Sequence, residues 1–196
     1  RGDLVERVRQ QLGPDAPQYA KIRVWYNHPL FIETTAQHWQ QAAEEIPAER
    51  RAGIRTLFTA HSIPQGMSDK SDYVVQLTEA CRLTAEAAGI ANWQLVYQSR
   101  SGPPHQPWLG RDIGDALRAL KEQGVTDVVV LPIGFISDHM EVLYDLDHEA
   151  ADLCDEIGLN MVRAATPGLH PSFVAMLAEL VHERLDPSLP KRALGS

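Results

Sequence analysis

Val128-Val129-Val130-Leu131 is the stretch that decides the fold class, because it is apolar on both faces. A β-strand carries apolar side chains on both faces where helices cover both sides of a parallel sheet. We therefore predict a central parallel strand within residues 125–132. Three other short apolar runs predict strands at residues 22–26, 54–60 and 93–97.

Amphipathic stretches separate these apolar runs along the chain. They predict helices near residues 31–46, 71–88, 112–123, 139–157 and 171–185. Asp112 is suited to cap the N-terminus of its helix, and Gly89 and Gly124 stand where a glycine commonly ends one. Strands that alternate with helices predict an α/β fold, with a doubly wound parallel sheet flanked by helices.

The composition narrows the function. The 196 residues suffice for one sizeable domain or two small ones. A net charge of −8 argues against nucleic-acid binding, which usually needs a basic face. No stretch approaches the roughly 20 apolar residues of a membrane span, and no signal peptide opens the sequence. Cys81 and Cys154 form no C-x-x-C pair, so we interpret them as buried thiols of a cytoplasmic protein.

Polar side chains follow several of the predicted strands. His61 follows the strand at 54–60, Gln98 and Ser99 follow the one at 93–97, and residues 134–138 follow the central strand. Ligands of a doubly wound sheet bind beyond the carboxyl ends of its strands. An imidazole beside carboxylates can hold a divalent transition metal and move protons near neutral pH. We therefore expect the functional site between His61 and the acidic helix that carries Glu141.

Glu141, Asp145 and Glu149 recur at four-residue spacing in the predicted helix at 139–157. Like charges at this spacing repel one another by a few tenths of a kcal/mol, roughly, for each adjacent pair. An α-helix rotates such a row by about 40° per step, and a wider turn would align it. Two interpretations stay open for the row, a path for cations or a solvated acidic face. Asp138 and Glu141 also fit a capping box, in which Glu141 bonds back to the helix N-terminus.

Ordered motifs connect these candidates to a known family. They are Trp25-Tyr26, Thr59-Ala60-His61-Ser62-Ile63-Pro64, Tyr97-Gln98-Ser99, Pro107-Trp108-Leu109-Gly110 and the stretch from Pro132-Ile133-Gly134-Phe135 to Asp147. In this order they resemble the ferrochelatases, which insert ferrous iron into a porphyrin in haem synthesis. The resemblance fades after Pro171 and implies a chelatase-like α/β fold. Because family members are longer, residues 1–185 are interpreted as the C-terminal α/β domain, with the family's N-terminal half absent. Residues 186–196 are expected to form a flexible tail.

The resemblance also implies roles for the metal side of the site. His61 corresponds to the group that accepts pyrrole protons, ligates the incoming iron, or both. Glu141 would be its proton partner or an oxygen ligand of the metal. His139 would lie beside the site as a proton relay, although structural capping explains it nearly as well. Asp145 and Glu149 would continue a metal path, since the family carries such an acidic row on a widened helical turn.

The porphyrin side is less specific. Tyr97, Ser99 and Trp108 resemble cleft-wall residues, and core packing is the alternative for the two aromatic side chains. Six further histidines are interpreted as structural or surface residues. They are His28, His38, His105, His148, His170 and His182.

Ferrous iron and a porphyrin, protoporphyrin IX or coproporphyrin III, are the implied substrates. No organic cofactor is expected, because neither a G-x-G-x-x-G motif nor a P-loop is present. Some bacterial ferrochelatases hold an iron–sulfur cluster through C-terminal cysteines, and residues 185–196 contain none. Two alternatives stay open. A related cobalt or nickel tetrapyrrole chelatase could use the same two residues, and an inactive fragment could bind porphyrin or metal, or serve as an interaction domain.

Overall fold

A computed structural model of the chain describes residues 2–103 and 105–195. Four strands form its sheet. They are β1 (Arg55–His61), β2 (Trp93–Gln98), β3 (Asp127–Leu131) and β4 (Asn160–Arg163). The strand order is β2-β1-β3-β4, and every neighbouring pair is parallel. The chain passes from β1 to β2 on one side and then crosses to β3 on the other, so the order reverses between β1 and β3. This arrangement confirms the predicted doubly wound sheet.

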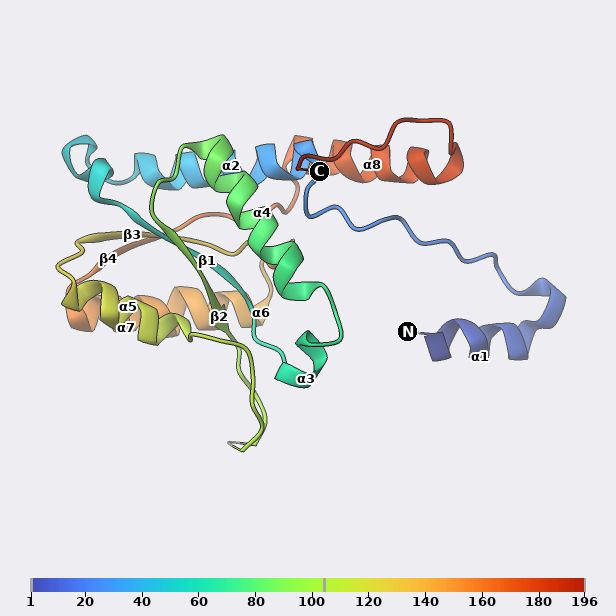
Figure 1. The fold of residues 1–196 in the computed structure, drawn as a ribbon, viewed down its shortest axis with the longest axis horizontal. Helices are drawn as coiled ribbons and strands as arrows, with labels where there is room; N and C mark the ends of the chain where they lie inside the picture. The colour runs from blue at the N-terminus through green and yellow to red at the C-terminus, as the bar shows by residue number, and fades with distance from the viewer. Residues whose placement is uncertain (1, 104, 196) are drawn as a thin grey trace.

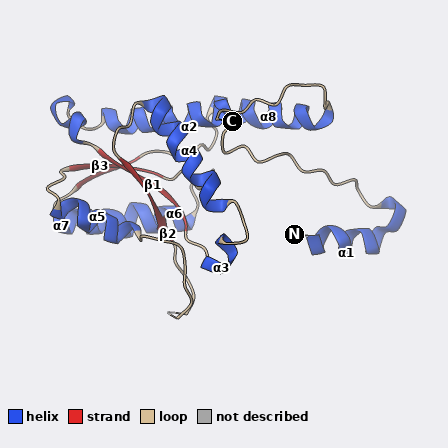
Figure 2. Cartoon of the chain, viewed as in Figure 1, coloured by secondary structure: helices blue, strands red, loops and turns tan. Residues whose placement is uncertain are grey.

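Helices cover both faces of the sheet (Figure 1; Figure 2). One layer consists of α2 (Pro29–Glu44), α4 (Tyr73–Ala88) and α8 (Pro171–Leu185). The other consists of α5 (Ile113–Glu122), α6 (Met140–Val142), the π-helix η3 (Leu143–Ala150) and α7 (Ala151–Ile157). Val129 and Leu131 pack into the core cluster on one face, while Val128 and Val130 pack into the cluster on the other. The strand that is apolar on both faces is therefore central, as predicted.

Four short elements complete the described chain. They are α1 (Gly2–Leu12), the 3-10 helices η1 (Gly13–Asp15) and η2 (Ala48–Gly53), and α3 (Gln65–Ser68). Helix α1 lies apart from the sheet, at the end of an extended segment that leads into α2 (Figure 1). The sequence analysis predicted none of these four elements.

Several predicted helix ends are confirmed. Asp112 caps α5, since its Oδ1 accepts a hydrogen bond of 2.8 Å from the Gly114 N–H. Gly89 ends α4 in the left-handed conformation, with φ at 71°, and Gly124 follows α5 with φ at 79°. His28 caps α2 by accepting a hydrogen bond from the Leu30 N–H at 3.2 Å. These contacts satisfy backbone groups that a helix end leaves unpaired.

Two strand assignments differ from the prediction. Residues 22–26 form no strand, and β4, which the sequence analysis did not anticipate, forms the edge of the sheet. The backbone of β4 pairs with β3, with Val129 opposite Val162. Segment 22–26 has no neighbouring strand among the described residues, and its Ile22, Trp25 and Tyr26 side chains instead pack against the core that α2 and α4 share. The prediction for 22–26 was wrong because a short apolar run does not reveal which partner buries it.

Residues 186–195 fold back along α8 toward the segment before α2 (Figure 1). The Leu194 N–H donates to the Asn27 carbonyl oxygen at 2.8 Å, and Arg192 pairs with Glu179 at 2.7 Å. Residue 196 lies outside the described residues, and the flexibility expected for 186–196 stays a prediction. Within the described ranges, no helix has the length and apolar character needed to span a bilayer.

Candidate active site

His61 and Glu141 meet at the carboxyl edge of the sheet. His61 is the last residue of β1, and Glu141 lies in α6, which follows the loop after β3. The His61 Nε2 lies 3.1 Å from the Glu141 Oε1, although the residues are 80 positions apart. Both side chains reach solvent, with exposed fractions of 33% and 45%. The strand order reverses between β1 and β3, and doubly wound folds bind their ligands at such a point.

Neighbouring groups hold both the imidazole ring and the backbone of His61. Its Nδ1 contacts the Ser62 carbonyl oxygen, and the Tyr73 hydroxyl donates to the His61 carbonyl oxygen at 3.0 Å. Burial, with a smaller effect from Tyr97, raises the pKa of Tyr73 to about 12, so its hydroxyl remains a donor. Ser62 donates in turn to the Leu109 carbonyl oxygen at 3.0 Å. The end of β1 is therefore fixed by contacts to α4 and to the loop after β2.

Gly134 brings the loop after β3 against the end of β1. Its N–H donates to the Thr59 carbonyl oxygen at 3.0 Å. A Cβ at this position would lie 2.7 Å from the Cβ and 2.9 Å from the Cα of Ala60, which is too close for any side chain. The glycine thus allows the approach that places Glu141 opposite His61.

The capping-box interpretation of Glu141 is wrong. The residue at the N-cap of α6 is His139, and no side chain accepts a capping hydrogen bond there. The Asp138 carboxylate instead pairs with Arg163 at 3.2 Å, and Arg163 also binds Asp147. Burial acts to lower the pKa of Arg163, but its hydrogen bonds to Asp147 and the charge of Asp138 outweigh this and raise it. Glu141 is left to bond His61.

His139 precedes α6, and its carbonyl oxygen accepts a hydrogen bond of 3.0 Å from the Leu143 N–H. Its ring is exposed and meets the Phe135 ring edge-on, with the centroids 5.5 Å apart. A ring contact of this kind orients an imidazole without fixing a proton on it. The role of His139 as a relay stays a prediction.

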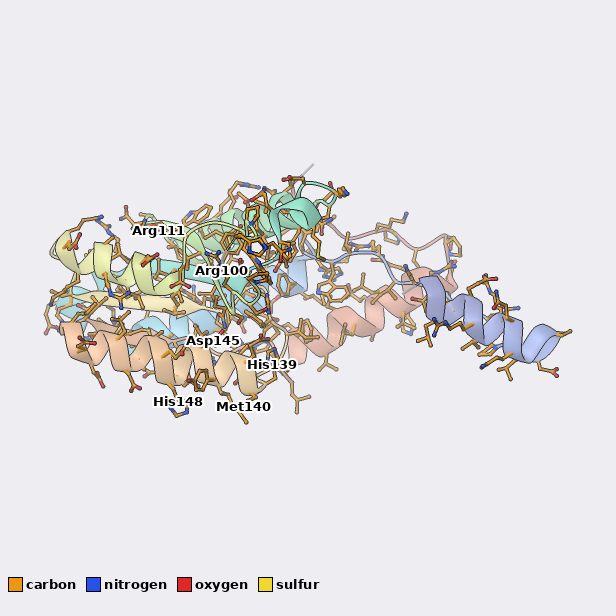
Figure 3. The ribbon with its side chains drawn as sticks, turned by 90° about the horizontal axis from the view of Figure 1, so that it is seen from below. Arg100, Arg111, His139, Met140, Asp145 and His148 are labelled. Atoms are coloured by element: carbon orange, nitrogen blue, oxygen red, sulfur yellow. The ribbon has the colours of Figure 1, made fainter. Side chains whose placement is uncertain are left out.

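Asp145 and Glu149 of the acidic row lie on a widened helix of the kind that the family resemblance implied, and Glu141 lies in α6 directly before it. Leu143–Ala150 form a π-helix, whose hydrogen bonds span five residues instead of four. Asp145 accepts hydrogen bonds from the Gln98 amide nitrogen at 3.2 Å and from the Ser99 hydroxyl. Figure 3 shows Asp145 on the sheet side of this helix, with Met140 and His148 on its outer side. Such π segments occur frequently at functional sites.

Asp145 and Glu149 share a small cavity between η3 and α5. The cavity has a volume of about 210 Å³. Ten residues line it: Gln98, Ser99, Asp112, Ile113, Gly114, Arg118, Asp145, Glu149, Ala150 and Leu153. Glu141 faces His61, so the three acids reach from the His61 site into this cavity. Whether cations use the row stays a prediction.

Two features around the Asp145 contacts escaped the sequence analysis. Ser99 has a φ of 61°. Every other residue with a positive φ in the described ranges is a glycine. The Gln98 side chain is buried, and its Oε1 finds no hydrogen-bond partner among the described residues. Strained backbone and unsatisfied buried groups are costly and concentrate at functional sites. The Gln-Ser pair directly after a strand was the available signal.

The predicted cleft-wall residues are placed differently from one another. Tyr97 is 6% exposed and packs in the core, with its ring 2.8 Å from the position that a Cβ on Gly110 would take. Trp108 is half-buried and bridges to Pro64, and its indole nitrogen has no partner in the described part of the chain. Ser99 lines the cavity of Asp145. Their porphyrin contacts stay predictions.

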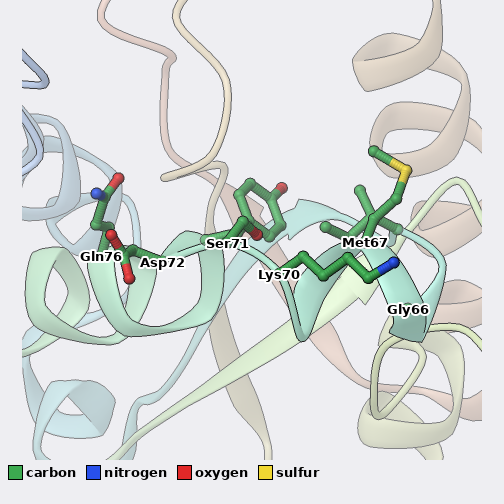
Figure 4. A pocket seen from close by; sticks show the side chains of 8 residues that line it. Gly66, Met67, Lys70, Ser71, Asp72 and Gln76 are labelled. Atoms are coloured by element: carbon green, nitrogen blue, oxygen red, sulfur yellow. The ribbon is translucent and has the colours of Figure 1, made fainter.

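Two apolar pockets lie on either side of Tyr73, next to the end of β1. Figure 4 shows the first, about 680 Å³ in volume, with Met67 and Lys70 on its rim. The second, about 450 Å³, is walled by Trp25 and Tyr26 on one side and by Gly134 on the other. The family motifs of the sequence analysis supply part of these walls, Ile63 in the first pocket and Trp25, Tyr26, Ile133 and Gly134 in the second. The pockets therefore place apolar surface near the end of β1, where His61 contacts Glu141.

Protein groups that could hold a metal are few. Within residues 2–103 and 105–195, no group of three or more histidine, cysteine, aspartate or glutamate side chains is arranged to hold an ion. His61 and Glu141 therefore offer one nitrogen and one carboxylate to an ion placed between them. Most coordination positions of such an ion would be left to water or to a substrate.

Comparisons with known proteins show the family to which the chain belongs. A family model described as Ferrochelatase matches residues 2–185. A ferrochelatase from Rhodopirellula baltica is 52% identical over 96% of this chain and 54% of its own length. Coproporphyrin III ferrochelatases from Nocardia farcinica and Mycolicibacterium smegmatis are 45% and 43% identical, over 96% and 97% of this chain and 56% and 57% of theirs. The chain thus spans about half the length of these relatives.

Solved structures share the fold at low identity. A cobalamin biosynthesis CbiX protein from Marinobacter aquaeolei is similar with a TM-score of 0.51 and 19% identity, over 69% of this chain and 99% of that one. The multi-domain protein DR2241 from Deinococcus radiodurans, described as similar to chelatases, has a TM-score of 0.54 and 14% identity, over 84% of this chain and 31% of its own. At these identities the likeness shows the chelatase-like fold alone.

Proposed function

The chain belongs to the ferrochelatase family, and from this premise we propose that it carries the metal-side residues of an enzyme that inserts ferrous iron into a porphyrin. The reaction takes one Fe²⁺ and one porphyrin, forms metal bonds to the four pyrrole nitrogens and releases two protons. The single observation that carries the proposal is the contact of His61 with Glu141 at the point where the strand order reverses.

The proton chemistry of this pair supports the proposal. The two nitrogens of the imidazole each face an oxygen, the Ser62 carbonyl at Nδ1 and the Glu141 carboxyl at Nε2. A neutral imidazole carries one N–H, so it can donate to one of these oxygens only. Both contacts become hydrogen bonds when a second proton lies between Nε2 and Oε1. The pair is therefore built to take up one proton of the kind that a pyrrole nitrogen loses.

A site with only two protein ligands, His61 and Glu141, suits a metal ion that must be transferred to the porphyrin. One imidazole and one carboxylate bind a divalent ion less tightly than a set of three or four protein ligands, and they leave positions open for pyrrole nitrogens. Asp145 and Glu149 would hold the hydrated ion on its way toward Glu141. In this proposal iron is a substrate that crosses the site, and the protein keeps no resident metal.

The two apolar pockets beside Tyr73 support a flat macrocycle as the second substrate. Their walls combine aromatic and aliphatic side chains with a lysine on the rim of the first pocket. A tetrapyrrole has an apolar plane and carboxylate side chains, so it matches such surfaces. Two relatives are named coproporphyrin III ferrochelatases, which makes coproporphyrin III the first porphyrin to test and protoporphyrin IX the second.

No organic cofactor and no iron–sulfur cluster form part of this proposal. Both described cysteines are buried. Burial raises the pKa of the Cys81 thiol, and burial with the nearby charge of Asp155 raises that of Cys154 to about 11. Buried protonated thiols are poor cluster ligands. The proposed location of the reaction is the cytoplasm.

An assay with purified protein tests the proposal. Coproporphyrin III and protoporphyrin IX are titrated against the chain and followed by absorbance, and turnover is then measured with ferrous, cobalt and nickel ions under reducing conditions. We expect porphyrin binding and a preference for iron. Turnover with cobalt or nickel alone would favour the related chelatase. Binding without turnover would favour the inactive fragment, and no binding would contradict the proposal.

A further inference from the structure

The wall of the second apolar pocket is formed by a segment without regular structure. Residues 17–27 connect the isolated helix α1 to α2, and Trp25 and Tyr26 line the pocket from this segment. In the described chain, the backbone of 17–27 takes part in two backbone hydrogen bonds, His28 N–H to Trp25 and Leu194 N–H to Asn27. A segment with so few bonds of its own needs other contacts to offset the entropy of ordering it.

The C-terminal tail, residues 186–195, supplies these contacts on both sides of Trp25 and Tyr26. On one side, Arg23 donates to the Arg192 carbonyl oxygen at 2.7 Å. On the other, the Asn27 side-chain amide donates to the Leu194 carbonyl oxygen at 2.9 Å, beside the backbone bond between the same two residues at 2.8 Å. The tail therefore binds the segment immediately before and immediately after the pocket wall.

Ion pairs attach both partners to α8. Arg23 binds Glu183 through two hydrogen bonds of 2.7 and 3.0 Å, and the Glu183 side chain is 8% exposed. Arg192 binds both carboxylate oxygens of Glu179, at 2.7 and 2.9 Å. The Arg23 contact uses two nitrogens and so fixes direction as well as distance, whereas Arg192 reaches both oxygens through Nη1 alone. Hydrogen bonding from Arg23 holds the pKa of Glu183 below its usual range, so Glu183 remains an acceptor.

The end of the tail also approaches the pocket wall directly. Gly195 and Tyr26 line one surface pocket together with Glu79 and Arg82 of α4. A Cβ on Gly195 would lie 2.4 Å from the Glu79 carboxylate, so the tail lies tight against α4 here. The tail thus spans from α8 to α4 across the segment that carries Trp25 and Tyr26.

We propose that the C-terminal tail positions the wall of the tetrapyrrole pocket, with Arg192 and Leu194 holding residues 23–27 so that Trp25 and Tyr26 face the macrocycle. The inference rests on the proposed function for the identity of the ligand. Arg23, Asn27 and Arg192 are positioning residues, because they act through the pocket wall and contact neither His61 nor Glu141. Loosening them lowers the fraction of molecules whose pocket is formed, and the apparent affinity falls by that fraction.

The test compares Arg192→Ala, a chain that ends at Leu185, and the unchanged chain. Hydrogen–deuterium exchange of residues 22–28 reports whether the segment is held, and coproporphyrin III binding and turnover report the pocket. Arg192→Ala should speed exchange in 22–28 and raise both the Kd and the KM for porphyrin by about three- to tenfold. The value of kcat should stay unchanged, because the His61–Glu141 pair is untouched. The shortened chain should show larger changes in the same direction.

Lys191→Ala is the matched control, since it removes one positive charge from the same tail at a position with no ion pair in the described chain. Arg192→Lys, which keeps the charge, should restore part of the affinity. Unchanged exchange in both tail variants overturns the inference, and so does faster exchange with unchanged porphyrin affinity. A loss confined to kcat also overturns it. If the unchanged chain binds no porphyrin, the proposed function fails, while the exchange measurement still decides whether the tail holds the segment.

Discussion

The two ends of the central strand β3 hold polar clusters of opposite character. At its amino end, Asp127 is fully buried and accepts hydrogen bonds from Thr126 and Asn160, both at 2.7 Å, and Arg50 pairs with it at 3.2 Å. Beyond its carboxyl end, the His61–Glu141 contact is open to solvent. The first cluster satisfies its own polar groups. The second leaves hydrogen-bonding and ligand positions free.

This difference separates a cluster that serves stability from one that serves chemistry. A buried carboxylate is tolerated when donors surround it, and it then fixes the elements that supply them. Partly exposed groups contribute little to stability, since water screens their interaction. They can nevertheless bind a substrate without first losing strong protein partners. Substitutions at the amino end should therefore change unfolding, and substitutions at the carboxyl end should change binding and turnover.

His61→Ala should give the largest effect on turnover. It removes the base that we propose for the pyrrole protons, and general bases contribute about 10²- to 10⁴-fold to a rate. Iron insertion, measured with saturating iron and porphyrin, should fall by that factor while the melting temperature stays nearly unchanged. Glu141→Gln should also lower turnover strongly and leave porphyrin binding intact. Near-normal turnover in the His61 variant would assign the proton chemistry to another group.

Asp127→Ala should give the largest effect on stability. It leaves the donors of Thr126 and Asn160 without their acceptor inside the protein, which costs about 2–4 kcal/mol in the free energy of unfolding. Urea denaturation measures this loss. Asp115→Ala is the control, because that side chain is 74% exposed and lies 4.0 Å from Arg118. Porphyrin affinity per folded molecule should be unchanged in both variants, and a loss of affinity in the folded Asp127 variant would break the comparison.

The acidic row tests how far the open cluster extends. Asp145→Asn combined with Glu149→Gln should weaken cobalt binding in the absence of porphyrin by about tenfold, as expected when groups that orient a bound metal are removed. The same change should raise the free energy of unfolding by about half a kcal/mol, because it relieves like-charge repulsion. Calorimetric titration with cobalt, which resists oxidation, measures the affinity.

Asp152→Asn combined with Asp155→Asn is the matched control for that measurement. Both side chains are exposed on α7, and their replacement removes the same charge at two positions that do not line the cavity. Equal cobalt affinity in the two double variants would reduce Asp145 and Glu149 to surface charge. The open cluster would then consist of His61 and Glu141 alone.

The sheet could be predicted because its central strands are long and apolar enough to be recognised from sequence. Strand β4 could not, since it has four residues with half-exposed side chains, and such a run resembles the apolar segment at 22–26. The two segments differ in the partner that each contacts. Val162 of β4 lies opposite Val129 in the sheet, while residues 22–26 contact the tail and the helices. Pairing between distant segments is not encoded in a local pattern.

Of the candidate site, the sequence analysis predicted that His61 and Glu141 meet, and the reason lies in the order of the strands. His61 ends one strand of the parallel sheet and Glu141 lies beyond the end of another, and topology alone brings such positions to the same edge. The contacts of Asp145 with Gln98 and Ser99 depend on where the π-helix widens and on the side-chain conformations of three residues. The position of residues 23–27 depends on contacts with residues more than 150 positions away, such as the ion pair of Arg23 with Glu183 and the hydrogen bonds of Asn27 with Leu194.

The last prediction concerns Ser99, whose φ of 61° places backbone strain at the open end of the sheet. Ser99→Ala and Ser99→Gly both remove the hydroxyl that donates to Asp145, but glycine alone also relieves the strain. The glycine variant should therefore be more stable than the alanine variant by about 1 kcal/mol in urea denaturation. Both should bind cobalt equally, because both have lost the same hydrogen bond. If alanine were as stable as glycine, the backbone at Ser99 would carry no strain, and the contrast between the two ends of β3 would rest on their hydrogen bonds and exposure alone.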